Sequence, residues 1–223
     1  MTKLDRDFLL SKSENFCMMP WVHMHFWPNG SVFPCCIADS SMPLGSYPKN
    51  SVEEIWNGPA MKEIRQNMLS DRPSKECSRC YLLEKNTKLD TLRTTSNKNF
   101  AKHFGSVETT KEDGTVERVN LAYLDVRFSN LCNLRCLTCG PLLSSSWYDD
   151  HKTIFGDPGH AKVLRIGAGD TPDGTEKFWR DLEPHLLSVE QVYFAGGEPL
   201  LSEEHYRVLD FWIAQGKTDV DIT

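Results

Sequence analysis

The sequence predicts an α/β protein, in which a small cysteine-rich α+β module precedes the first strands of a parallel βα sheet or barrel. The eight cysteines fall into two groups, at residues 17–80 and 132–139, and none lies between them. From residue 121 onward, apolar strand candidates alternate with helix candidates, which is typical of a parallel βα fold. The length of 223 residues suffices for one ordinary domain plus a small module, or for two small domains.

Composition excludes several classes of protein. The chain has 25 basic and 31 acidic residues and no long basic run, which argues against nucleic acid as its main partner. No apolar stretch approaches the ~18 residues of a membrane helix. The polar N-terminus does not resemble a signal peptide, so we expect a cytoplasmic, reducing compartment. Clustered cysteines there indicate metal or redox chemistry rather than disulfides.

The first group of cysteines is accompanied by clear structural signals. Residues 22–33 alternate around the turn Pro28-Asn29-Gly30 and predict a β-hairpin. Ser51 and Glu54 form a capping box at the start of one helix, and Pro59 starts a second. That second helix has an apolar face and ends before Pro73.

The middle of the chain is harder to assign. Residues 83–104 are polar and are interpreted as a linker with some helix. Asp113-Gly114, between Val107 and Val119, predicts another hairpin. We therefore predict a module over residues 1–95, a linker and hairpin over 96–118, and the βα region over 119–223.

The βα region contains three predicted strands and three predicted helices. The predicted strands are residues 121–129, 189–197 and 218–223, and the predicted helices are residues 142–155, 176–187 and 202–216, the last with Gly216 as its C-cap. The predicted fold is therefore a parallel βα sheet or barrel that stops at its third strand.

Cys132, Cys136 and Cys139 form a C-x3-C-x2-C motif in the loop after the first of these strands. A structural zinc site needs four ligands, commonly as two separated pairs. Three thiolates at this spacing can instead hold three irons of a [4Fe–4S] cluster and leave the fourth iron open to another ligand. The alternative is a zinc knuckle that takes its fourth ligand from elsewhere in the chain.

A second motif, Gly196-Gly197-Glu198-Pro199, ends the second strand, where glycines allow a ligand to approach the backbone. Together, in this order, the two motifs resemble those of the radical S-adenosylmethionine (SAM) superfamily. The resemblance implies that Cys132, Cys136 and Cys139 bind a [4Fe–4S] cluster, and that residues 196–199 meet the methionine amino group of SAM. Thr138 departs from the pattern, because the superfamily often has an aromatic residue there, near the adenine.

The resemblance also implies a reaction and partners. SAM is cleaved to methionine and a 5′-deoxyadenosyl radical, which abstracts hydrogen from the substrate. The expected electron donor is a flavodoxin or ferredoxin, and the expected substrate is a peptide or protein. A superfamily barrel has more strands than are present here, so the chain is expected to be a fragment or to be completed by a second chain. No residue is assigned a catalytic role.

Cys17, Gly30 and Cys35, followed by Cys77-x2-Cys80, resemble the auxiliary-cluster modules called SPASM and twitch. The resemblance implies an auxiliary [4Fe–4S] cluster held by Cys17, Cys35, Cys77 and Cys80, with the module placed before the barrel rather than after it. Cys36 could replace Cys35, since neighbouring residues on an extended chain point to opposite sides. A zinc-ribbon-like site with the same four ligands is the alternative.

Two other classes of function stay open from the sequence. One is a non-catalytic iron–sulfur electron-transfer module, although residues 196–199 would have no role there. The other is a zinc-stabilised interaction protein. His23 and His25 are expected on one face of a strand rather than as ligands, and Asp125 and Arg127 are interpreted as facing the barrel interior, near SAM or substrate.

Overall fold

The computed structural model describes residues 5–87, 89–168 and 173–223. Within these residues, a six-stranded mixed sheet has the order β3-β2-β1-β4-β5-β6. The strands are β1 (His23–Phe26), β2 (Ser31–Phe33), β3 (Gly45–Ser46), β4 (Tyr123–Val126), β5 (Gln191–Phe194) and β6 (Asp221–Ile222). Strands β1, β4, β5 and β6 are parallel to one another, whereas β1 with β2 and β2 with β3 are antiparallel.

The predicted α/β class is confirmed, and the sheet is mostly parallel. The described residues form an open sheet with β3 and β6 at its edges, and they do not close a barrel. The predicted hairpin at residues 22–33 is confirmed as β1 and β2, and the three strands of the predicted βα region are β4, β5 and β6. No helix in the described part of the chain is long and apolar enough to cross a membrane.

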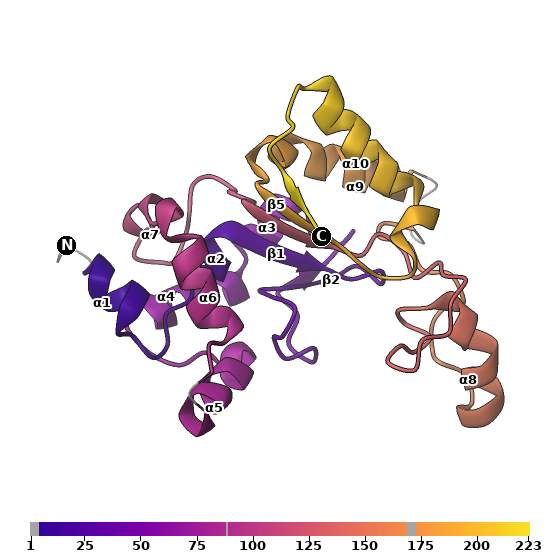
Figure 1. Ribbon diagram of the computed structural model, residues 1–223, viewed down its shortest axis with the longest axis horizontal. Helices are drawn as coiled ribbons and strands as arrows, with labels where there is room; N and C mark the ends of the chain where they lie inside the picture. The colour runs from indigo at the N-terminus through magenta and orange to yellow at the C-terminus, as the bar shows by residue number, and fades with distance from the viewer. Residues whose placement is uncertain (1–4, 88, 169–172) are drawn as a thin grey trace.

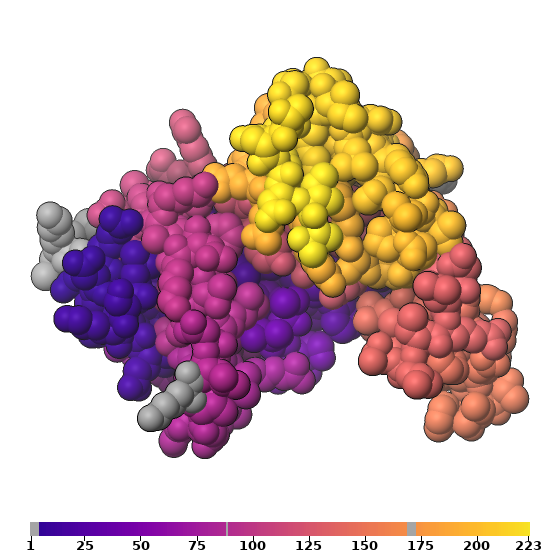
Figure 2. Space-filling model, viewed as in Figure 1, coloured from indigo at the N-terminus to yellow at the C-terminus, as the bar shows by residue number. Residues whose placement is uncertain are grey.

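In the view of Figure 1, most of the helices before β4 lie to the left of the sheet, and Figure 2 shows this part of the chain gathered on that side. The helices before β4 are α1 (Arg6–Ser11), α2 (Met19–Val22), α3 (Val52–Trp56), α4 (Pro59–Leu69), η1 (Lys75–Cys77), α5 (Ser78–Asn86), α6 (Leu92–Asn99), η2 (Ala101–His103) and α7 (Gly105–Glu108). The predicted capping box is present, because the Ser51 hydroxyl accepts a hydrogen bond from the Glu54 N–H and the Glu54 carboxylate accepts one from the Ser51 N–H.

The helices after β4 lie in two places (Figure 1). They are η3 (Ser145–Trp147), α8 (Tyr148–Phe155), α9 (Gly174–Leu182), η4 (Glu183–Ser188), η5 (Pro199–Leu201) and α10 (Glu203–Ala214). In the view of Figure 1, α9 and α10 lie together above the sheet, whereas α8 projects from the body of the molecule.

The two faces of the sheet differ in chemistry. On one face, Phe26 packs against Phe178 of α9, and Phe194 packs against Trp212 of α10. The other face carries His23 and His25 of β1 and Tyr123 and Asp125 of β4, as the alternation of side chains along a strand requires. Phe100, just after α6, stacks on Tyr123 on this second face. The sheet therefore has an apolar core on one side and a polar buried layer on the other.

The pairing of β1 with β4 was not predicted. These parallel strands are about one hundred residues apart in sequence and join in the register His23↔Tyr123 to Phe26↔Val126. A hairpin from the predicted module and a strand from the predicted βα region therefore belong to one sheet. The division at residues 1–95, 96–118 and 119–223 stays a prediction, but the two parts are joined by main-chain hydrogen bonds.

The helix predicted within residues 83–104 is present and is more extensive than expected, because α5 and α6 occupy most of this stretch. Thr91 caps α6, and the buried polar residues of that helix have internal partners. Asn97, for example, accepts a hydrogen bond from the Met18 N–H at 2.9 Å and donates one to the Phe16 carbonyl at 3.1 Å. A buried polar helix resembles a linker in sequence because only the tertiary partners distinguish the two.

The hairpin predicted around Asp113-Gly114 is a turn without flanking strands. The turn closes through hydrogen bonds between Lys111 and Thr115 and from Gly114 to Lys111. Beyond it, both main-chain polar groups of Val116 pair with the side-chain amide of Asn57 instead of with a second strand. A side chain from α3's end thus satisfies the backbone that a hairpin partner would otherwise satisfy.

Gly30 is the position in the β1–β2 turn where glycine is required. Its φ of +85° lies in the left-handed region, and a Cβ there would lie 2.0 Å from the Tyr47 carbonyl oxygen. The Gly30 carbonyl accepts a hydrogen bond from the Tyr47 N–H at 2.8 Å. The turn is therefore packed directly against the chain that follows β3.

We expect Gly30→Ala to lower the free energy of unfolding by about 1–3 kcal/mol, the scale of a strained backbone position. The measurement is anaerobic urea unfolding followed by tryptophan fluorescence. Gly105→Ala is the control, since Gly105 starts α7 and a Cβ there meets nothing within 4 Å. Equal stability of the two variants would contradict this account of the turn.

Candidate metal centres

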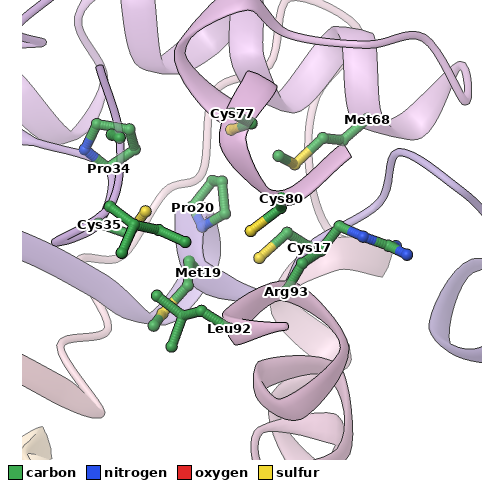
Figure 3. A pocket seen from close by; sticks show the side chains of 12 residues that line it. Cys17, Met19, Pro20, Pro34, Cys35, Met68, Cys77, Cys80, Leu92 and Arg93 are labelled. Atoms are coloured by element: carbon green, nitrogen blue, oxygen red, sulfur yellow. The ribbon is translucent and has the colours of Figure 1, made fainter. Parts of the chain in front are cut away.

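Cys17, Cys35, Cys77 and Cys80 line one hollow, as Figure 3 shows. They come from four segments: the stretch before α2, the loop after β2, η1 and α5. The hollow is small, with a cavity volume of about 20 Å³. Its remaining wall is made of apolar residues and one arginine, namely Met19, Pro20, Pro34, Ile37, Ala38, Met68, Leu92 and Arg93.

Main-chain hydrogen bonds hold these segments together. The Asp39 N–H donates to the Glu76 carbonyl at 3.1 Å, which joins the loop after Cys35 to η1. Within that loop, the Ala38 N–H donates to the Cys35 carbonyl at 3.3 Å. The predicted helical insert, α3 and α4, brings the chain from the hairpin to Cys77 and places Met68 in the wall. The hollow is therefore built from residues that are distant in sequence.

Burial dominates the acid–base properties of these thiols. It raises the pKa of Cys77 to about 12, with the neighbouring Glu76 and Cys80 adding to the rise. The pKa values of Cys17 and Cys35 are also raised well above the ordinary value, and burial is again the main cause. Without metal these groups are thiols, so metal binding must release protons as the thiolates form.

Cys36 lies apart from the four. It is exposed and does not belong to the wall of the hollow. The charges of Asp125 and Arg127 both influence its pKa, which places it toward the polar face of the sheet. The structure therefore brings Cys35, rather than Cys36, together with Cys17, Cys77 and Cys80.

The second group, Cys132, Cys136 and Cys139, lies in the loop between β4 and η3. Burial raises the pKa of Cys139, and the neighbouring Cys136 and Cys132 raise it further, so the three sulfur atoms share one region. The loop bends back on itself through a hydrogen bond from the Cys139 N–H to the Cys136 carbonyl at 3.0 Å. Cys136 is exposed, and the other two are partly buried.

Three consecutive serines fix the start of this loop. The Cys132 N–H donates to the Ser145 hydroxyl at 3.1 Å, and the Ser146 hydroxyl donates to the Cys132 carbonyl at 2.7 Å. The Ser144 hydroxyl donates to the Leu134 carbonyl at 2.9 Å. Residues 142–155 were predicted as a helix and the role of these serines was missed, although three adjacent serines after a cysteine motif were the available signal.

Residues 196–199 lie directly against the cysteine loop. The Glu198 N–H donates to the Leu131 carbonyl at 2.8 Å, one residue before Cys132. Gly197 has φ +60°, and a Cβ there would lie 2.2 Å from the same carbonyl oxygen. Since β4 and β5 are adjacent and parallel, the loops at their carboxyl ends meet, which is where open α/β sheets bind ligands.

A buried polar group lies beside these loops, on the second face of the sheet. His25 Nδ1 lies 2.7 Å from the Asp125 carboxylate, and both side chains are 1% exposed. The Trp27 indole N–H donates to His25 Nε2 at 2.6 Å, so Nδ1 carries the proton and donates to Asp125. Burial lowers the pKa of His25, which favours the neutral ring. The second carboxylate oxygen of Asp125 has no hydrogen-bond partner among the described residues.

The hollow formed by the first group fits an iron–sulfur cluster. Its four donors are thiols, its walls are largely apolar, and the donors border a shared space rather than a surface. In the described part of the chain, no group of three or more His, Cys, Asp or Glu is arranged to hold a single metal ion.

The fold and this hollow define an α/β protein with four cysteines around one largely apolar hollow. Residues 17–81 match the family model of the SPASM iron–sulfur cluster-binding domain. This part of the chain is therefore a SPASM domain, a type of domain typical of radical SAM enzymes. No radical SAM family model matches the chain, and neither a curated protein nor a solved structure matches it.

In the metal-free protein, we expect alkylation by iodoacetamide to follow exposure of the thiols. Cys36 and Cys136 are exposed and should react first, whereas Cys17 and Cys80 are buried and should react last. Mass spectrometry of digested samples taken over time measures each rate. Modification of Cys17 before Cys136 would contradict the burial of the thiols that line the hollow.

Proposed function

We propose that the chain is part of a radical SAM enzyme with an N-terminal auxiliary-cluster domain. The observation that carries this proposal is the contact between the two motif loops. The C-x3-C-x2-C loop and residues 196–199 end adjacent parallel strands and are hydrogen-bonded through the Glu198 N–H and the Leu131 carbonyl. A SPASM domain in the same chain supports the same class of enzyme.

In this proposal, Cys132, Cys136 and Cys139 hold a [4Fe–4S] cluster, and residues 196–199 hold the methionine part of SAM. The bound cluster and SAM supply one-electron chemistry, the reductive cleavage of SAM that leads to hydrogen-atom abstraction from a substrate. The serines at residues 144–146 fix the main chain around Cys132. The left-handed glycines keep residues 196–199 close to that loop.

The proposed auxiliary cluster is a [4Fe–4S] cluster whose ligands are Cys17, Cys35, Cys77 and Cys80. The module that holds it would be of the shorter, twitch type, with one cluster. Cys36 is not a ligand in this proposal, since it lies outside the hollow. The four parallel strands would form part of a βα barrel. The proposed reductant is a flavodoxin or ferredoxin, and the proposed substrate is a peptide or protein.

We expect anaerobic reconstitution with iron and sulfide to give about eight irons per chain, four for each [4Fe–4S] cluster. Cys17→Ala/Cys80→Ala should lose about four, and Cys132→Ala/Cys136→Ala/Cys139→Ala should lose the other four. Cys36→Ala is the control and should keep all of them. Iron, sulfide and zinc analysis makes the measurement.

Zinc without iron at both sites would overturn the proposal and leave a structural metal protein. Iron lost entirely in the Cys132→Ala/Cys136→Ala/Cys139→Ala variant, with zinc retained, would limit the proposal to the SAM site. Iron lost in the control as strongly as in the Cys17→Ala/Cys80→Ala variant would overturn the assignment of Cys35 over Cys36.

We expect SAM to change the electron paramagnetic resonance (EPR) spectrum of the reduced Cys17→Ala/Cys80→Ala protein, which keeps only the second cluster. Adding Gly197→Ala should abolish that change, because its Cβ would lie 2.2 Å from the Leu131 carbonyl oxygen. Gly140→Ala is the matched control, since Gly140 follows Cys139 and its Cβ would meet nothing within 4 Å. A spectrum that does not respond to SAM before either substitution would favour a plain electron-transfer module.

A further inference from the structure

Arg93 belongs to the wall of the first hollow although it lies beyond the matched residues 17–81. It is the second residue of α6, and only 7% of it is exposed. In Figure 3 the base of its side chain lies next to Cys17 and its guanidinium end points away from the cysteine sulfur atoms. Its charge still interacts with the thiols of both Cys17 and Cys80. Among the described residues that line the hollow, it is the only one with a charged side chain.

The guanidinium is held on several sides. Its Nη1 donates to the Ser13 carbonyl at 2.9 Å and to the Phe16 carbonyl at 2.8 Å, immediately before Cys17. Its Nε donates to both carboxylate oxygens of Glu84, at 3.0 Å each, and its Nη2 donates to Glu84 as well. Such a fixed fork of donors is specific to arginine. The charge therefore has a defined place beside the cysteines.

The main chain of α6 also reaches the ligands. Burial raises the pKa of the Cys80 thiol, and the nearby backbone N–H of Arg93 acts in the opposite direction and lowers it. The neighbouring Thr91 hydroxyl donates to Glu84, the same carboxylate that binds the guanidinium. The start of α6 thus contacts Cys80 through its backbone and the segment before Cys17 through a side chain.

The positive charge of Arg93 bears on the reduction potential of a cluster bound in the hollow. A cluster with four thiolate ligands is an anion, and each added electron makes it more negative. In an apolar hollow the field of a nearby charge is screened less than in water. Reduction potentials of iron–sulfur clusters depend on net charge, hydrogen bonds to sulfur and exposure. A buried guanidinium beside two of the ligands therefore favours the reduced cluster.

We propose that Arg93 sets the reduction potential of the cluster bound by Cys17, Cys35, Cys77 and Cys80, and that Glu84 moderates its effect. The inference rests on the proposed auxiliary cluster. It assigns a redox-tuning role to α6, which lies outside the matched SPASM segment, and it extends the functional unit from residue 81 to at least residue 93.

The test is an EPR-monitored redox titration of the full chain carrying Cys132→Ala/Cys136→Ala/Cys139→Ala, so that only this cluster contributes. Arg93→Met should shift the midpoint potential to a more negative value, and Arg93→Lys should shift it less. Glu84→Gln should shift it to a more positive value. Lys98→Met is the matched control, because it removes the same charge from the same helix at a side chain that is 65% exposed.

Equal midpoints for Arg93→Met and Lys98→Met, at full iron content, would overturn the inference and leave the proposed cluster intact. If Arg93→Met takes up no iron, Glu84→Gln decides, since it keeps the guanidinium: a positive shift supports the inference, and an unchanged midpoint overturns it. Zinc in place of iron in this parent variant would instead overturn the proposed auxiliary cluster, on which the inference rests.

Discussion

The parallel pairing of β1 with β4 is the interaction on which the rest of the structure depends. It adds the hairpin of the SPASM domain to the sheet whose next strands lead to both motif loops. Main-chain hydrogen bonds fix the register of this pairing. The segments that carry the two cysteine groups are therefore attached to one and the same sheet. The buried pair of His25 and Asp125 lies across this same junction. One carboxylate oxygen of Asp125 lacks a hydrogen bond among the described residues, and its burial has a free-energy cost that the surrounding packing must offset.

The two groups of cysteines differ in how deeply they are buried, and this difference affects the chemistry that each can support. The first group lies in a largely apolar hollow, where thiols stay protonated without metal and where a single charge has a large electrostatic effect. The second group lies in a partly exposed loop that is held by serine hydroxyls and by the turn at residues 196–199. A closed site suits electron storage or transfer, whereas an open loop leaves room for an exchangeable ligand. The proposed division into an auxiliary cluster and a SAM site follows this difference.

The local signals in the sequence were largely sufficient for individual elements. The hairpin, the Ser51 capping box and the three strands of the βα region all appear where they were predicted. The errors fall where the backbone or polar side chains find distant partners. The α6 helix is polar in sequence and so resembled a linker, but in the fold its polar residues are buried and pair with the segment around Cys17. The turn at Asp113 lacks flanking strands because the Asn57 side chain forms the hydrogen bonds that the Val116 main chain needs.

The sequence by itself determined the candidate cluster-binding and SAM-binding residues, because cysteine spacing and a glycine turn after a strand are local patterns. It led to the SPASM resemblance that the family match at residues 17–81 confirmed. Only the tertiary structure decided which cysteine of the adjacent pair, Cys35 or Cys36, faces the hollow, and that Arg93 completes its wall. Those decisions depend on the direction of side chains and on contacts between distant segments, and no local pattern encodes either one.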